Sequence, residues 1–112
     1  MSENTEYKGL SIVPGRVIAP LILIDCNKLN IDTNLVLGKI AVIRVATPAI
    51  VLWLRNAAGL VVERGGIASH GAILAREFNI PSIVGIEGIY DRLSNDLLGE
   101  LQSDLGILKV WT

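Results

Sequence analysis

The segment from Gly65 to Gly85, GGIASHGAILAREFNIPSIVG, holds the residues whose types and spacing best support chemistry. Its centre is His70, the only histidine of the chain, which follows Ser69 and the pair Gly65-Gly66. An imidazole titrates close to neutral pH, so the neutral ring that acts as a nucleophile is available there. Two glycines let the preceding backbone bend tightly and present amides to an anion. The pattern predicts a histidine that takes up a phosphoryl group.

A helix over 69–78 is expected to position this imidazole. Ser69 should be the N-cap, and the helix should end at Asn79 because Pro81 cannot continue it from the residue before. His70 then lies in the first turn, near the rim of the packed face. Four residues at the spacing of one helix face should pack on a sheet: Gly71, Leu74, Ala75 and Phe78.

A phosphorylated His70 would carry about two negative charges at neutral pH. The first amides of a helix and the positive end of its dipole favour such an anion. Ser69 and one cation would add to this stabilisation, and the nearest cations in the sequence are Arg64 and Arg76. Arginine suits phosphate because its donors form a planar fork.

The spacing alone leaves other interpretations of His70 open. A lone histidine near a helix start is most often a surface or rim residue without a chemical role. A metal site is disfavoured, because one histidine and the distant Cys26 do not make a ligand set. A serine–histidine hydrolase is also disfavoured, since the side chains of Ser69 and His70 diverge and the chain has no nucleophile-elbow motif.

The segment closely resembles the phosphohistidine domain of the phosphoenolpyruvate-utilising enzymes. That family includes phosphoenolpyruvate synthase, pyruvate phosphate dikinase and enzyme I of the bacterial sugar phosphotransferase system. Their mobile domain carries the motif G-G-x-x-[ST/C]-H-x-[AS]-x-x-A-R, followed by [IL]-P and a Val-Gly pair. The matching residues of this chain are Gly65, Gly66, Ser69, His70, Ala72, Ala75, Arg76, Ile80, Pro81, Val84 and Gly85.

The resemblance extends from about Lys8 to Val110 and implies the family's swivelling β/β/α fold, a parallel central sheet with a smaller antiparallel layer and helices outside. It implies that His70 is phosphorylated on Nε2 and that Ser69 contacts the phosphate or orients the ring. It makes Arg76 a secondary candidate for binding the phosphate, with an ion pair on the helix surface or between elements as the alternative. The amides of Gly65 and Gly66 are expected to bind the phosphate as an anion nest. The chain departs from the family pattern at Gly71, where alanine or threonine is commoner, and at Leu105, where the closing turn has a glycine.

The remaining pattern predicts one α/β domain over residues 1–112, with a disordered tail at 1–6. A strand, helix, strand, helix, strand alternation in the middle favours a parallel layer with right-handed crossovers. Strands near both ends could form a second, antiparallel layer. The expected strands are Lys8–Val13, Arg16–Asp25, Lys39–Val45, Leu60–Glu63, Ser82–Ile86 and a hairpin of Leu98–Ser103 with Ile107–Trp111. The expected first helix begins at Thr47-Pro48 and runs to Ala57, with Gly59 as its stop.

Composition excludes several classes of function. The net charge of −1 offers no electrostatic surface for nucleic acid. The apolar stretch Ala49–Leu54 is too short to cross a membrane. A single cysteine, Cys26, cannot form an internal disulfide and indicates a reducing cytoplasm.

The chain shows neither a P-loop motif nor an acidic cluster for magnesium, so we expect a carrier that binds no cofactor or metal itself. A nucleotide-binding or a PEP/pyruvate-binding subunit, using Mg with ATP or PEP, would then be its partner. Met1 favours a free-standing protein over an excised domain. The apolar segment 48–57 is expected to dock a partner or form a homodimer. A non-catalytic interaction module, or the small subunit of a lyase or dehydratase with the same fold, remains the alternative.

Overall fold

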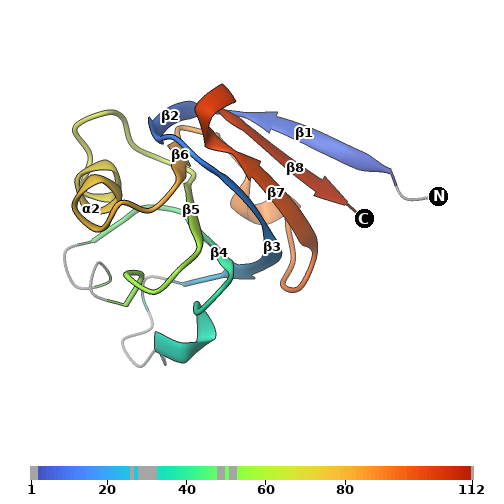
Figure 1. The fold of residues 1–112 in the computed structure, drawn as a ribbon, viewed down its shortest axis with the longest axis horizontal. Helices are drawn as coiled ribbons and strands as arrows, with labels where there is room; N and C mark the ends of the chain where they lie inside the picture. The colour runs from blue at the N-terminus through green and yellow to red at the C-terminus, as the bar shows by residue number, and fades with distance from the viewer. Residues whose placement is uncertain (1–2, 26, 28–32, 48–49, 51–52, 112) are drawn as a thin grey trace.

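The structure is a computed structural model that describes residues 3–25, 27, 33–47, 50 and 53–111 (Figure 1). One helix of regular length is found in these residues, α2 (His70–Phe78). The strands are β1 (Asn4–Lys8), β2 (Leu10–Val13), β3 (Arg16–Leu23), β4 (Ile40–Ile43), β5 (Gly59–Val62), β6 (Ser82–Val84), β7 (Leu98–Gln102) and β8 (Ile107–Trp111). Short 3₁₀ turns occur at η1 (Thr33–Leu35), η2 (Tyr90–Arg92) and η3 (Ser103–Leu105).

The strands form one mixed sheet in the order β1-β8-β7-β3-β4-β5-β6-β2. The four strands β3, β4, β5 and β6 are parallel, and β2 closes that part antiparallel to β6. Strands β7, β8 and β1 continue from β3 as an antiparallel part. β3 belongs to both parts, because Arg16–Pro20 pair with β7 and Leu21–Leu23 pair with β4. The predicted combination of parallel and antiparallel layers is confirmed.

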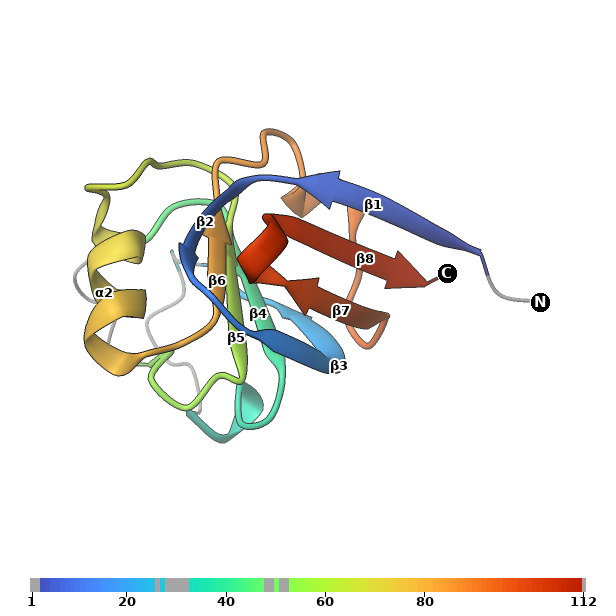
Figure 2. The same ribbon diagram turned by 45° about the horizontal axis from the view of Figure 1, so that its top comes forward.

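The parallel strands lie between two covering layers, and their residues alternate between two cores. Ala41 and Ile43 of β4 belong to the core beneath α2, whereas Ile40 and Val42 belong to the core beneath the antiparallel strands. Every residue of β4 and β5 is buried. Continuous aliphatic runs are typical of strands that are covered on both faces. Figure 2 shows α2 on one side of β4, β5 and β6 and the antiparallel strands on the other.

The N-terminal region differs from the sequence prediction. A disordered tail was expected at 1–6, but residues 4–6 belong to β1, which pairs along its length with β8. The strand expected over Lys8–Val13 is interrupted at Gly9, whose N–H donates to the Gly106 carbonyl oxygen at 2.9 Å. The chain changes there from the antiparallel part to the edge of the parallel part. Local composition could not reveal this partner, because β8 lies at the other end of the chain.

The segment between β4 and β5 also differs from prediction. Of the expected helix, residues 48–49 and 51–52 lie outside the described residues, as does Cys26. Ile50 is helical, but residues 53–56 form turns and Ala57 makes an isolated bridge with Leu37. Gly59 is the first residue of β5 instead of a helix stop. A Cβ there would lie 2.8 Å from Leu101 Cδ2, so close packing between the layers explains this glycine.

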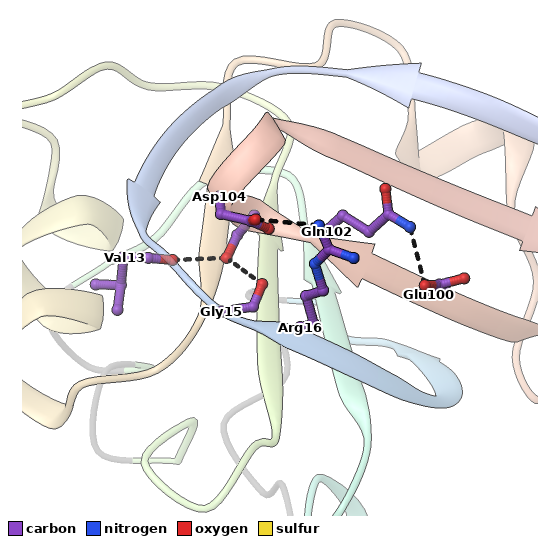
Figure 3. Close-up of polar contacts among 7 residues, drawn as sticks. Val13, Gly15, Arg16, Glu100, Gln102 and Asp104 are labelled. Atoms are coloured by element: carbon purple, nitrogen blue, oxygen red, sulfur yellow. Dashed lines mark hydrogen bonds and ion pairs between the residues drawn. The ribbon is translucent and has the colours of Figure 1, made fainter.

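Long-range polar contacts fasten the turn between β2 and β3 to η3 (Figure 3). The buried Ser103 hydroxyl donates to the carbonyl oxygens of Val13 and Gly15, at 2.7 and 3.0 Å. On the surface, Arg16 Nη2 lies 3.3 Å from Asp104 Oδ2. These contacts join the start of β3 to the hairpin of β7 and β8, so the two parts of the sheet share a fixed junction.

No helix within the described residues is long and apolar enough to cross a lipid bilayer.

Candidate functional site

The loop that carries His70 leaves the carboxyl end of β5 and enters α2. His70 is the first residue of the helix and is exposed. Among the hydrogen bonds of the described residues, none engages its imidazole. In Figure 2 this loop lies at the same edge of the sheet as the carboxyl ends of β4 and β6. The ring is therefore accessible to a reactant from outside the chain.

Ser69 is the N-cap of α2, as predicted. Its backbone is extended (φ −70°, ψ 162°), and its Oγ accepts from the Ala72 N–H at 3.3 Å. The same hydroxyl donates to the Gly66 carbonyl oxygen at 2.7 Å, and the Ser69 N–H donates to that oxygen at 3.1 Å. Ser69 therefore joins the helix start to the glycine loop, in the manner expected of an N-cap.

The two glycines of the loop have different constraints. Gly65 has φ +130°, and a Cβ there would lie 2.9 Å from the Ser69 side chain. A Cβ on Gly66 would meet nothing within 4 Å, and the observed contacts of Gly66 are made by its carbonyl oxygen. Gly85 at φ +79° passes close to Gly65, since its Cβ would lie 3.5 Å from the Gly65 carbonyl oxygen. The loop thus depends on a glycine at 65 for its shape, whereas a Cβ at 66 would meet no neighbouring atom.

The packed face of α2 agrees with the predicted spacing. Gly71, Leu74 and Ala75 are buried, and Phe78 packs half-buried against the same core. A Cβ on Gly71 would lie 3.0 Å from Val62 Cγ2 and 3.3 Å from Ala46 Cβ. The family's commoner alanine would therefore be tight at this position.

The helix ends where the sequence predicts. Asn79 adopts the left-handed conformation (φ 54°, ψ 46°), and its N–H reaches the carbonyl oxygens of Ala75 and Arg76. Asparagine is one of the residues that tolerate this conformation at a helix end. The chain then passes through Pro81 into β6.

Arg76, predicted to bind phosphate, makes a contact that the sequence did not indicate. Its Nη1 donates to the Ile67 carbonyl oxygen at 2.7 Å, so the guanidinium bridges the helix and the loop before His70. Sequence reasoning missed Ile67, because any residue can offer a main-chain carbonyl oxygen and no side-chain type marks it. The guanidinium is exposed, and it lies on the same helix–loop unit as the imidazole.

Two amides at the start of α2 remain available to an anion. The Ala72 N–H is bound by Ser69 Oγ and the Ile73 N–H by the Ser69 carbonyl oxygen. Within the described part of the chain, the N–H groups of His70 and Gly71 donate to no acceptor. Such open amides at the positive end of a helix favour a negatively charged group. The described residues contain no group of three or more His, Cys, Asp or Glu side chains that could hold a metal ion.

The chain is similar in sequence to a protein family and to several longer proteins. Residues 36–103, more than half of the chain, match the family model described as "PEP-utilising enzyme, mobile domain". A probable phosphoenolpyruvate synthase of Methanothermobacter thermautotrophicus is 27% identical over 108 residues, which cover 96% of this chain and 15% of the synthase. The uncharacterized phosphotransferase YvkC of Bacillus subtilis is 31% identical over 94 residues, which cover 81% of this chain and 11% of that protein.

Solved structures show the same fold. An NMR structure of an Enzyme I protein (nEIt) is 27% identical, with a TM-score of 0.56 over 64% of this chain and 30% of that one. Aconitase X of Thermococcus kodakaraensis has a TM-score of 0.71 over 95% of this chain at 17% identity, a likeness of fold alone. The match of the family model over 36–103 shows that the chain belongs to the mobile-domain family of PEP-utilising enzymes.

Proposed function

We propose that the chain is a phosphohistidine carrier that relays a phosphoryl group through His70 from a PEP- or ATP-dependent partner to an acceptor. The observation that carries this proposal is the position of His70. Its imidazole is exposed and unengaged among the described residues, beside two open amides at the start of α2. Membership in the mobile-domain family supports it.

The proposed reaction has two transfers. The Nε2 of His70 attacks the phosphorus of the donor, the bond between phosphorus and the donor oxygen breaks, and that oxygen leaves with the donor. The phosphohistidine then has about two negative charges, which the open amides and the helix dipole stabilise. In the second transfer the acceptor oxygen attacks the same phosphorus, the bond between phosphorus and Nε2 breaks, and its electron pair returns to the imidazole. A proton that the acceptor hydroxyl loses passes to solvent.

Ser69 and Arg76 would act mainly by positioning in this scheme. The Ser69 hydroxyl already donates to Gly66, and Arg76 already donates to Ile67. Both contacts hold the loop that leads into His70. An arginine has further N–H groups, so Arg76 could keep Ile67 and still offer a donor to the phosphate. Contact of Gly65 and Gly66 amides with the phosphate remains part of the proposal.

The donor site is expected on a partner subunit or domain, which would hold Mg with ATP or PEP. The chain spans 15% of the length of the Methanothermobacter synthase and 11% of that of YvkC, so their remaining parts have room for such sites. Ile67 and Ile73, 59% and 52% exposed, stand on either side of His70 in the sequence and could contact this partner. Dimerisation through 48–57 and a cytoplasmic location remain predictions. Trp53, the tryptophan of that segment, is half-buried against the core.

Phosphate labelling tests the proposal. The full chain is incubated with a nucleotide-binding or PEP-binding partner subunit and either γ-labelled ATP or labelled PEP. We expect an acid-labile, base-stable label on the wild-type chain and its complete loss in His70→Ala. Glu77→Gln serves as the matched control, because Glu77 is an exposed residue of the same helix and should keep the label.

Absence of label with both donors, or retention of label in His70→Ala, would contradict the carrier role. A wild-type chain that binds the partner without becoming labelled would instead be the interaction module. The lyase-subunit alternative has no support beyond fold likeness.

A further inference from the structure

A cleft of about 380 Å³ opens at the carboxyl edge of the parallel strands. Its walls come from the segments that follow β3, β4 and β5 and from η2. Ligands of open α/β sheets bind outside the carboxyl ends of the strands. The volume lies near the lower end of the usual range for small-molecule sites, about 300–1,000 Å³. The lining residues are Ile24, Asp25, Asn27, Arg44, Val45, Thr47, Arg64 and Tyr90.

A buried carboxylate holds two of these walls together. The side chain of Glu63, at the end of β5, is only 4% exposed. Its Oε1 accepts from the Tyr90 N–H at 3.0 Å, and its Oε2 lies 3.6 Å from Arg64 Nε. Glu63 therefore holds Tyr90 by a hydrogen bond and lies beside the guanidinium of Arg64. In the sequence, Glu63 is marked only as a charged residue after an apolar run.

Arg44 also lines this cleft. The Arg44 guanidinium carbon lies 4.5 Å from the centre of the Tyr90 ring, and its Nη2 lies 2.6 Å from Asp91 Oδ1. The main chain joins the two arginines, because the Arg64 N–H donates to the Arg44 carbonyl oxygen at 2.8 Å. The side chains of Arg44 and Arg64 are still 48% and 72% exposed. Two arginines thus line one cleft, each beside a carboxylate, and their side chains are exposed enough for a ligand to reach.

We propose that this cleft binds a small molecule that carries a single phosphate group. Arginine forks match phosphate oxygens, so the phosphate would lie against Arg44 and Arg64. Ile24, Val45 and the Tyr90 ring would contact the body of the molecule. Asp25 disfavours a second strongly acidic group by like-charge repulsion and favours a hydroxyl or amine there.

This site is separate from the phosphorylated imidazole and goes beyond the carrier role, because the lining of the cleft does not include His70. Binding there needs neither a phosphoryl donor nor a partner subunit. Both sites nevertheless lie at the carboxyl edge of the sheet, and Arg64 directly precedes the loop of Gly65 and Gly66.

Amide chemical shifts of the unphosphorylated wild-type chain, titrated with glycerol 3-phosphate, test the proposal. We expect saturable shifts at residues 44–47, 64 and 90, weaker shifts with inorganic phosphate and none with glycerol. Arg64→Gln should weaken binding at least tenfold. Arg16→Gln is the matched control, since Arg16 is an exposed arginine paired with Asp104 and should bind as the wild type does.

Three results would overturn the cleft as a site. They are shifts that do not saturate, equal binding by Arg64→Gln, and shifts confined to the start of α2. The amide spectrum of Arg64→Gln reports its folding, and Arg64→Lys, which keeps the charge and loses the fork, should retain part of the affinity. This experiment contains no phosphoryl donor. Binding at the cleft can therefore fail while labelling of His70 succeeds, and labelling can fail while binding at the cleft succeeds.

Discussion

The loop before His70 and the junction between β3 and η3 are both held by side-chain hydrogen bonds, but the bonds span very different lengths of chain. In the loop, Ser69 bonds residues three positions away and Arg76 bonds a residue nine positions away. At the junction, Ser103 bonds residues 88 and 90 positions away. The contacts of the loop form between residues that are close in the sequence, whereas the contacts of the junction form only when both ends of the chain have come together.

This difference separates two kinds of effect. A change in the local loop should alter the presentation of His70 and cost the whole fold little, because few residues depend on it. A change at the junction should lower the free energy of unfolding of the entire domain, because it closes the antiparallel part onto the parallel part. Comparing stability with phosphate uptake in matched variants distinguishes these outcomes.

Ser103→Ala should have the largest effect on stability. It removes a buried donor from two carbonyl oxygens, and we expect a loss of about 1–3 kcal/mol in the free energy of unfolding, measured by urea denaturation. Ser94→Ala, at an exposed serine, should stay within about 0.5 kcal/mol of the wild type. If Ser103→Ala behaved like this control, the junction would not stabilise the domain. Phosphate uptake by its folded fraction should be unchanged.

Ser69→Ala should reverse this pattern. Loss of the N-cap should cost about 1 kcal/mol of stability, while the initial rate of phosphate uptake should fall by a larger factor than the loss of folded protein accounts for. Ser69→Thr keeps a capping hydroxyl and should recover most of both quantities. Equal rates for Ser69→Ala and the wild type would show that the contact with Gly66 does not position His70.

Gly71→Ala should have the smallest net effect, because two contributions oppose each other. Alanine is favoured over glycine inside a helix by about 1 kcal/mol. The added Cβ would however lie 3.0 Å from Val62 Cγ2, which requires a small shift. We expect a net change of less than about 1 kcal/mol in thermal or urea denaturation. A loss of several kcal/mol would mean that α2 cannot move relative to β5.

Much of the site could be predicted from residues that are close in the sequence. Ser69 as N-cap, the end of α2 at Asn79 and the packed face of the helix follow from capping chemistry, backbone preferences and a period of 3.6 residues. The strands β4, β5 and β6 were recognisable as aliphatic runs between turn residues. β4 and β6 are shorter than expected and β5 begins and ends one residue earlier, because pairing, not composition, ends a strand.

Other features had no local signal. β1 is polar and exposed along most of its length, and only its pairing with β8 makes it a strand. Gly59 resembled a helix stop, although its small size serves the contact with Leu101. Arg76 carried the right charge for phosphate, but its contact with Ile67 depends on where the loop lies.

The sequence by itself determined which histidine is the candidate nucleophile, the capped helix start on which it lies and the alternation of buried strands and helix, since each depends on neighbours within about ten residues. The tertiary structure decided how β3 divides between two sheet parts and which strand pairs with the N-terminal segment. It also decided that Arg44, Arg64 and Tyr90 line one cleft. These features arise from hydrogen bonds and packing between distant segments, and their energies depend on which partners the fold brings together.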